Sequence, residues 1–139
     1  MNPWEDPRLV AGLRRQLAAR QAAVDGGDTP IGWKVGFGAP AALSSMELAA
    51  PLPGYLTDRT LFESGRAVDT SSWVKGLIEF EVAVYVGQDL GSGTTPSIAR
   101  DAVTSLGPAI EVADLDLVPA PHAVEEILAG DIFHRGVVL

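Results

Sequence analysis

The clearest pattern in the chain is an alternation of apolar and polar side chains over residues 77–86. This segment is rich in β-branched and aromatic residues, which favours a β-strand. Successive side chains of a strand point to opposite faces. One face is therefore wholly apolar and is expected to be buried; it comprises Ile78, Phe80, Val82, Val84 and Val86. The other face begins with Glu79 and Glu81, which we expect near the rim of a core.

The spacing of Glu79 and Glu81 points to a cation. Two residues along a strand span roughly 6.5–7 Å. Partly buried carboxylates at that distance repel each other, and one of them tends to protonate. A hard divalent ion such as Mg²⁺, Mn²⁺ or Ca²⁺ relieves the repulsion and prefers carboxylate oxygens. The alternative is an ordinary solvated face of an antiparallel strand.

The pattern predicts an amphipathic helix at the N-terminal end. Asp6 and Pro7 form a helix start, and Gly26-Gly27 forms a stop. Between them an apolar stripe faces a basic side that we expect to be solvated. The stripe comprises Leu9, Leu13 and Leu17, with Val10 and Val24 beside it, and the basic residues are Arg14, Arg15 and Arg20.

A second strand is predicted over residues 31–38, where one face holds only glycines around Lys34. Glycine weakens a strand and often marks close approach of a ligand or backbone. Lys34 is thus a candidate cation in a glycine-lined pocket, where it would face an anion or pass a proton. The alternative is a surface lysine on an edge strand.

The remaining elements are less sharply patterned. We expect a helix over residues 39–50, a break at 51–54, and a loop with a short extended segment over 55–62. Residues 96–106 indicate a helix, 109–114 a strand, 123–129 a helical turn, and 137–139 the opening of a strand. Asp58 and Arg59 are expected to form a surface pair, and His122 is expected to be exposed.

Glu111 is a second candidate ligand because it lies inside the short apolar strand. A buried carboxylate without a partner is costly, so Glu111 could supply a third oxygen beside Glu79 and Glu81. The alternative, a solvated residue of an alternating strand, stays open.

Composition excludes several classes of function. The 139 residues suffice for one domain with a modest core. A net charge of −8 disfavours nucleic-acid binding. The absence of cysteine excludes disulfides, thiolate zinc sites and cysteine nucleophiles. No apolar run approaches the ~18 residues of a membrane span and no signal pattern is visible, so a cytoplasmic protein without a membrane partner is expected.

Taken together, these pieces resemble the N-terminal half of the 2-keto-4-pentenoate hydratases. That family includes 4-oxalocrotonate decarboxylases and lies in the fumarylacetoacetate hydrolase superfamily. The motifs that carry the resemblance are Gly32-Trp33-Lys34-Val35-Gly36, Glu79-Phe80-Glu81, Ala109-Ile110-Glu111-Val112 and Asp131-Ile132-Phe133-His134-Arg135-Gly136. Each is weak alone, but the four in this order and spacing are specific.

The resemblance implies an α+β fold in which an N-terminal helix accompanies a mixed β-sheet, half of a β-roll. Residues 1–139 would form one partial domain, with a helical lead-in over 1–30 and the N-terminal part of a catalytic domain over 31–139. Family members are about twice as long, and their second half walls the pocket. An isolated half is expected to be weakly stable, dependent on self-association, or inactive.

The resemblance also implies the site and its chemistry. Glu79, Glu81 and Glu111 would bind one Mg²⁺ or Mn²⁺, with Lys34 and Asp131 in the active site and Asp58 as a weaker candidate. The implied reaction is hydration of 2-hydroxypenta-2,4-dienoate to 4-hydroxy-2-oxopentanoate in aromatic-compound catabolism. Decarboxylation of 4-oxalocrotonate, hydrolysis of an acylpyruvate, and a non-catalytic subunit are the alternatives. The implied partners are a 2-keto or 2-hydroxy-dienoic acid and a second copy or related subunit.

Overall fold

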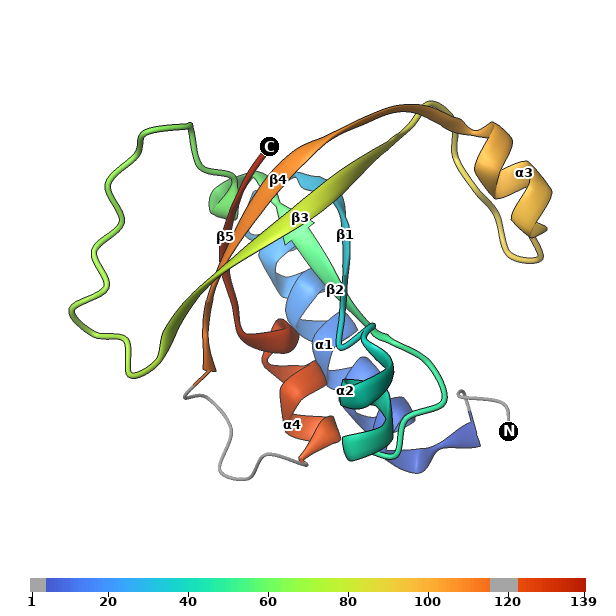
Figure 1. Cartoon of the computed structure of the whole chain (residues 1–139), viewed down its shortest axis with the longest axis horizontal. Helices are drawn as coiled ribbons and strands as arrows, with labels where there is room; N and C mark the ends of the chain where they lie inside the picture. Colours follow the sequence, from blue (N-terminus) through green and yellow to red (C-terminus); the bar gives the residue numbers. More distant parts are fainter. Residues whose placement is uncertain (1–4, 116–122) are drawn as a thin grey trace.

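Two small antiparallel sheets and a pair of packed helices make up the fold (Figure 1). The computed structural model describes residues 5–115 and 123–139, so the expected exposure of His122 falls outside these ranges. The helices are α1 (Pro7–Asp25), α2 (Pro40–Ser45), α3 (Pro96–Asp101) and α4 (Val124–Ala129), with single turns η2 (Asp58–Thr60) and η4 (Asp131–Phe133). The strands are β1 (Pro30–Gly36), β2 (Leu52–Thr57), β3 (Gly76–Val86), β4 (Val103–Asp114) and β5 (His134–Val138). The predicted α+β class is confirmed.

Helix α1 begins as predicted, because the Asp6 side chain accepts a hydrogen bond from the backbone N–H of Arg8 at 2.9 Å. Its buried face differs from the leucine stripe that the spacing predicted. Leu9, Gly12 and Gln16 are buried, whereas Val10 and Leu17 are exposed. The shift has a steric cause: Gly12 has no side chain, so α4 can approach α1 closely, and a β-carbon at Gly12 would lie 2.7 Å from Leu128 Cβ.

Two arginines on the basic side of α1 contact neighbouring elements. Arg15 reaches the Glu126 carboxylate of α4 at 2.6 Å, and Arg20 lies over the ring of Trp33 at 5.1 Å. Arg14 and Arg15 are exposed as expected, whereas Arg20 is half-buried against the Trp33 ring.

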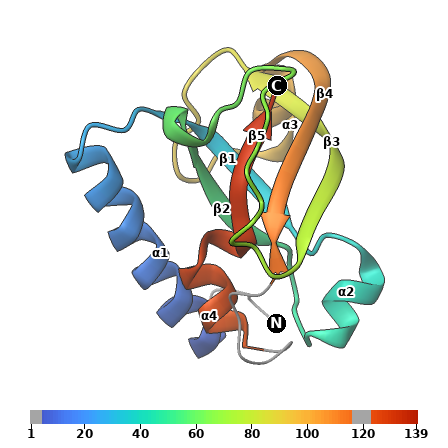
Figure 2. The same cartoon turned by 90° about the vertical axis from the view of Figure 1, so that its left-hand side faces the viewer.

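Strand pairing is antiparallel in both sheets. Strand β1 pairs with β2, and β4 lies between β3 and β5. Within the described residues, parallel pairing is limited to the bridge between Leu61 and Val137, so the expected mixture of strand directions is confined to that point. Figure 2 shows the β1–β2 pair between α1 on one side and the β3–β4 ribbon on the other.

Three boundaries differ from the sequence expectations. The helix expected over 39–50 ends at Ser45, and Glu47 then turns the chain with φ 53°. The break and loop expected over 51–57 form strand β2 instead, because β1 supplies hydrogen-bonding partners that local turn signals do not reveal. The helix expected over 96–106 stops at Asp101, and the following residues join the long pairing of β4 with β3.

The hydrophobic core lies where α1, α2 and α4 meet the base of the sheets. Its buried members are Leu9, Met46, Leu48, Leu52, Ala113, Val124, Ile127, Leu128, Ile132 and Phe133. No helix within the described residues has both the length and the apolar character needed to cross a membrane.

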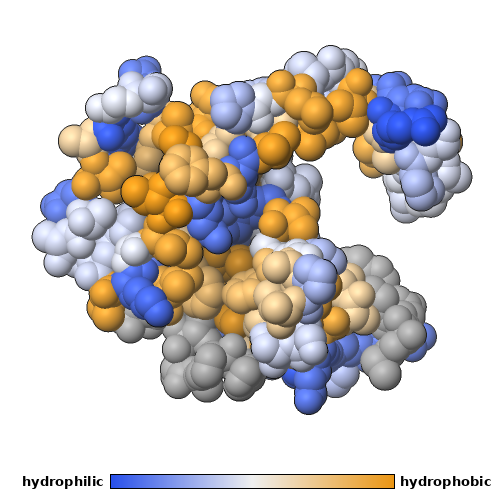
Figure 3. All heavy atoms as spheres, viewed as in Figure 1, coloured by the Kyte–Doolittle hydropathy of each residue, from blue (hydrophilic) through white to orange (hydrophobic). Residues whose placement is uncertain are grey.

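The apolar face of β3 lies outside this core, which contradicts its expected burial. The exposed fractions are 63% for Ile78, 87% for Phe80, 68% for Val82, 53% for Val84 and 51% for Val86. Strands β3 and β4 form a projecting arm that carries α3 at its far end (Figure 1). Hydrophobic residues line this arm in the space-filling view (Figure 3). The alternation was interpreted correctly as a strand, but nothing in the described chain packs on this face.

We predict that Phe80 contributes little to the stability of the isolated chain. Phe80→Thr is expected to change the free energy of unfolding by less than about 0.5 kcal/mol, because the ring is exposed. The matched variant Leu128→Ala is expected to lose about 2–5 kcal/mol, because Leu128 is fully buried. Urea unfolding at low micromolar concentration measures both. Equal losses would mean that the β3 face is covered in solution.

Candidate metal centre and active site

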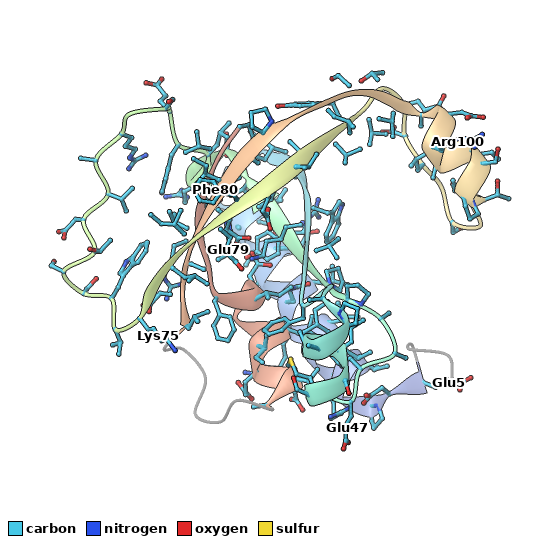
Figure 4. The ribbon with its side chains drawn as sticks, viewed as in Figure 1. Glu5, Glu47, Lys75, Glu79, Phe80 and Arg100 are labelled. Carbon is cyan, nitrogen blue, oxygen red and sulfur yellow. The ribbon has the colours of Figure 1, made fainter. Side chains whose placement is uncertain are left out.

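The register of the β3–β4 ribbon places the three predicted glutamates on one face. Glu79 lies directly opposite Glu111, and Glu81 lies opposite Ala109. Residues paired across strands share a face, as do residues two apart along one strand. Glu79 and its neighbour Phe80 accordingly point to opposite sides of β3 (Figure 4). The fold therefore gathers three acidic side chains from two strands that are distant in sequence.

Glu111 is the buried centre of this group. Lys34 Nζ donates a hydrogen bond to Glu111 Oε1, and His134 Nδ1 lies 2.8 Å from the same oxygen. The side chains of Lys34, Glu111 and His134 are all buried. A buried carboxylate needs such partners, because removing one partner of a buried ion pair costs about 3–5 kcal/mol. Lys34 is thus neither a surface residue nor solvated, and Glu111 is not on an open strand face.

Glycine in β2 makes room for Lys34. Gly54 lies opposite Lys34 in the β1–β2 pair. A β-carbon at Gly54 would lie 2.8 Å from both Lys34 Cγ and Lys34 Cε, and 3.0 Å from Asp131 Oδ1. The lysine stem can cross β2 toward β4 only because this position has no side chain. Close approach was predicted for the glycines of the lysine strand itself; the partner strand provides it as well.

Asp131 enters the site from a strained turn. Asp131, Ile132 and Phe133 have φ values of 54°, 53° and 64°, the left-handed region that non-glycine residues rarely adopt. Such residues cost on the order of 1–3 kcal/mol each. The turn directs the Ile132 carbonyl to Lys34 Nζ at 3.1 Å, and Asp131 Oδ1 accepts from the Tyr55 backbone N–H at 2.9 Å. The strained turn therefore brings the Ile132 carbonyl to Lys34 and the Asp131 carboxylate beside Gly54.

The charges in this site act on one another. Burial raises the pKa of Glu81, and the neighbouring charges of Glu111 and Glu79 raise it further. Burial also opposes ionisation of Glu111, but His134 and Lys34 outweigh that effect and hold its pKa below the ordinary range. The result is one stabilised carboxylate beside one that ionises reluctantly.

The donor set suits a hard cation, although its side chains are not arranged as a coordination sphere. Three carboxylates share a face, and burial and the charges of Glu111 and Glu79 raise the pKa of Glu81, which is the situation that a divalent ion relieves. Within residues 5–115 and 123–139, however, no three His, Cys, Asp or Glu side chains converge closely enough to hold an ion. Glu111 Oε1 is instead engaged by Lys34 and His134.

Asp58 lies apart from this cluster. Its carboxylate accepts a hydrogen bond from the Thr29 backbone N–H at 2.8 Å, which lowers its pKa. Arg59 pairs with Asp28 at 2.7 Å. The expected surface pair of Asp58 with Arg59 is therefore replaced by two separate contacts to the loop that precedes β1.

A cavity of about 550 Å³ lies behind the cluster, between the end of α1, η2 and the start of β5. Asp131 and His134 line it together with Tyr55, Thr60 and Arg135. Asp131 is the one predicted site residue in this lining; the other five are Lys34, Asp58, Glu79, Glu81 and Glu111. Asp131 and His134 therefore connect the buried charges to a second, partly polar space.

Two polar residues of the site were missed by the sequence reasoning. His134 lies in one of the four recognised motifs but received no role. Its position at the start of an apolar strand, as one of two histidines, was the available signal. Gln16 is buried in α1 and donates to Pro53 O at 3.0 Å and to Asp131 Oδ1 at 3.2 Å. It occupies a helical position three residues from a leucine, and nothing local marks it as functional.

The sequence is similar to those of two curated enzymes. The chain is 26% identical over 132 residues to a 4-oxalocrotonate decarboxylase from Pseudomonas sp., covering 95% of this chain and 51% of that protein. It is 33% identical over 104 residues to a 2-hydroxypent-2,4-dienoate hydratase from Pseudomonas putida, covering 73% of this chain and 44% of that protein. The chain thus spans about half the length of the curated relatives it matches. No family model matches it.

Solved structures show the same fold. The 4-oxalocrotonate decarboxylase from Pseudomonas putida G7, complexed with magnesium and adipate, superposes with a TM-score of 0.81 at 22% identity. The match covers 94% of this chain and 50% of that chain, its N-terminal half. The same enzyme complexed with calcium and acetate gives a TM-score of 0.80 at 22% identity, covering 94% of this chain and 49% of that chain. The expected fold is therefore confirmed, whereas the division into a helical lead-in over 1–30 and a catalytic part over 31–139 stays a prediction.

We predict that Asp131 makes stability fall as pH rises. Burial raises the pKa of Asp131 to about 6 from its ordinary 3.8. A raised pKa adds stability that is complete below pH 3.8 and is lost as pH rises through about 6. This difference corresponds to at most about 3 kcal/mol, at 1.36 kcal/mol per pH unit. Asp131→Asn should therefore be more stable than the parent chain at pH 7 but not at pH 3.5.

Urea unfolding between pH 3.5 and 7.5 measures this effect, with the exposed Asp101→Asn as the matched control. A constant difference between Asp131→Asn and the parent chain across that range would contradict the assignment.

Proposed function

We propose that this relative of the 4-oxalocrotonate decarboxylases and 2-hydroxypent-2,4-dienoate hydratases carries the metal half of a lyase site. Its substrate would be a 2-hydroxy-dienoic or 2-keto acid, and its reaction the hydration of 2-hydroxypenta-2,4-dienoate to 4-hydroxy-2-oxopentanoate. The observation that carries the proposal is the alignment of Glu79, Glu81 and Glu111 on one face of β3–β4 with Lys34 against the third.

The three glutamates would hold Mg²⁺ or Mn²⁺. These ions take carboxylate oxygens, and relatives of this fold were crystallised with magnesium or calcium. When bound, such an ion supplies positive charge that binds the substrate carboxylate and stabilises charge developing on its 2-oxo oxygen. Three protein ligands leave room for both substrate oxygens.

Lys34 and Asp131 would act on the substrate from the β1–β2 side. The Lys34 ammonium is held by Glu111 and the Ile132 carbonyl, so it presents a fixed positive charge beside the glutamates. It would serve as an electrostatic partner or as a proton carrier. Asp131 touches Tyr55 and Gln16 and would orient a polar group through hydrogen bonds. Asp58 would contribute only indirectly, by accepting the Thr29 backbone N–H and so holding the loop that precedes β1.

Related reactions use the same residues. Decarboxylation of 4-oxalocrotonate and hydrolysis of an acylpyruvate both develop negative charge next to a 2-keto acid, and both remain alternatives. The choice depends on the pocket walls. In the two curated relatives about half of the sequence lies outside the region matched by this chain, and that region would supply walls that discriminate among the three reactions.

A non-catalytic subunit is the second candidate function, and the exposed β3 face favours it. A row of five apolar side chains that are half or more exposed is unusual for an isolated soluble chain. Strand β3 is also an edge strand of 11 residues, so its backbone can pair with another strand. A chain that retains the sheet could therefore pack on a second copy or on a related subunit without turning over substrate.

The ligand assignment predicts selective loss of metal binding. Glu79→Gln and Glu81→Gln should each weaken Mn²⁺ binding by at least tenfold, because each removes a charged oxygen ligand. Glu5→Gln and Glu47→Gln are matched controls, since both are exposed and lie at the opposite end of the molecule from Glu79 (Figure 4). Calorimetric titration of the metal-free chain measures all four. Equal affinities would refute the ligand set.

The two candidate functions differ in turnover. If the chain is an enzyme, adding it with Mg²⁺ or Mn²⁺ to 2-hydroxypenta-2,4-dienoate should make the dienoate absorbance decay. The Glu79→Gln variant should not produce this decay. A folded chain that binds Mn²⁺ but turns over neither this substrate nor 4-oxalocrotonate would favour the hypothesis of a non-catalytic subunit. Parallel sedimentation measurements would then report whether the chain self-associates.

A further inference from the structure

We propose that His134, held by Thr60, is a positioning residue that fixes Glu111 by one carboxylate oxygen, so that the other oxygen stays available to the proposed metal ion. This inference rests on the proposed function, because it assigns a role to residues around one of the three proposed ligands. It adds two residues that neither the sequence motifs nor the comparisons assign.

The hydrogen bonds at Glu111 are distributed unequally. Lys34 Nζ and His134 Nδ1 both engage Oε1. Among the described residues, no hydrogen bond to Oε2 is present. Because both partners act on the same oxygen, the carboxylate is held in one orientation while its second oxygen remains available.

His134 is better suited than Lys34 to set that orientation. The lysine stem has several rotatable bonds, and its ammonium is a point charge that can follow a moving carboxylate. The imidazole ring is rigid and is held from both sides. His134 Nε2 lies 3.0 Å from Thr60 Oγ1, and Thr60 Oγ1 lies 3.2 Å from Thr57 O.

The direction of each bond follows from the groups involved. A carboxylate only accepts, so His134 Nδ1–H donates to Glu111. The Thr60 hydroxyl has one proton: it gives that proton either to a neutral Nε2, or to Thr57 O while it accepts from a protonated Nε2. A chain of hydrogen bonds therefore leads from Thr60, at the cavity wall, through His134 to Glu111, on the glutamate face of β3–β4. Hydrogen-bonded groups behind a metal ligand commonly change metal affinity by 10–100-fold.

Two substitutions at His134 separate hydrogen bonding from packing. The side-chain nitrogen of asparagine overlays Nδ1 of histidine, whereas that of glutamine overlays Nε2. His134→Asn can therefore still donate to Glu111, and His134→Gln cannot. Thr60→Val keeps the shape of Thr60 and removes the bond to the ring. Thr94→Val is the control, because the Thr94 hydroxyl donates to Gly91 O near the tip of the arm.

The test is a Mn²⁺ titration of each variant of the 139-residue chain, monitored by calorimetry and by the electron paramagnetic resonance of free Mn²⁺. Thermal unfolding of the metal-free variants reports whether each one folds. We expect His134→Gln to bind Mn²⁺ 10–100-fold more weakly than the parent chain and Thr60→Val to bind several-fold more weakly. We expect His134→Asn and Thr94→Val to remain within about threefold, since the donor to Glu111 is retained.

A second measurement uses the parent chain alone. The Nδ1–H proton of His134 should be protected from exchange and should shift when Mg²⁺ is added, as seen by nitrogen-edited NMR. Unchanged Mn²⁺ affinity in His134→Gln, or equal losses in His134→Asn and His134→Gln, would overturn the positioning role alone. A parent chain that binds no Mn²⁺ would overturn the proposed function and this inference together.

Discussion

The buried ion pair between Lys34 and Glu111 is the interaction on which the site depends. It joins β1 of one sheet to β4 of the other, across 77 residues of sequence. A charge buried in this way is tolerated only with its partner, so each residue fixes the position of the other. The glycine opposite Lys34 and the histidine beside Glu111 follow from this pair, because one gives the lysine room and the other completes the carboxylate's contacts.

The surrounding structure stabilises a costly arrangement. Three consecutive residues of η4 adopt left-handed backbone angles, and the carboxyl of Asp131 is buried beside charges of both signs. Strain and buried charge usually persist where function requires them. The packing of α4 on α1 offsets that cost, since Ile127 and Leu128 are fully buried and lead directly into the turn. Stability and site geometry are therefore coupled through residues 127–133.

The sequence predicted the elements that carry a strong local signal and missed those set by distant contacts. Strand β3, helix α1 and the chemistry of Glu111 follow from periodicity, capping and the cost of an unpaired buried acid. Strand β2 was missed because Pro53 and Gly54 resemble a turn, and only pairing with β1 makes this segment extended. The apolar face of β3 was expected to be buried because alternation identifies a face but not what covers it. His134 and Gln16 were missed because a single polar residue has no period. The roles of Lys34, Asp131, Asp58 and the three glutamates remain predictions.

The central claim is that Glu79, Glu81 and Glu111 share one divalent ion while Lys34 and His134 hold the last of them. Anomalous diffraction from crystals of the chain grown with Mn²⁺ tests it most directly. The account predicts one manganese peak between β3 and β4, within bonding distance of an oxygen from each glutamate. Manganese bound elsewhere, or crystals without a peak in which Lys34 and Glu111 remain paired, would contradict it.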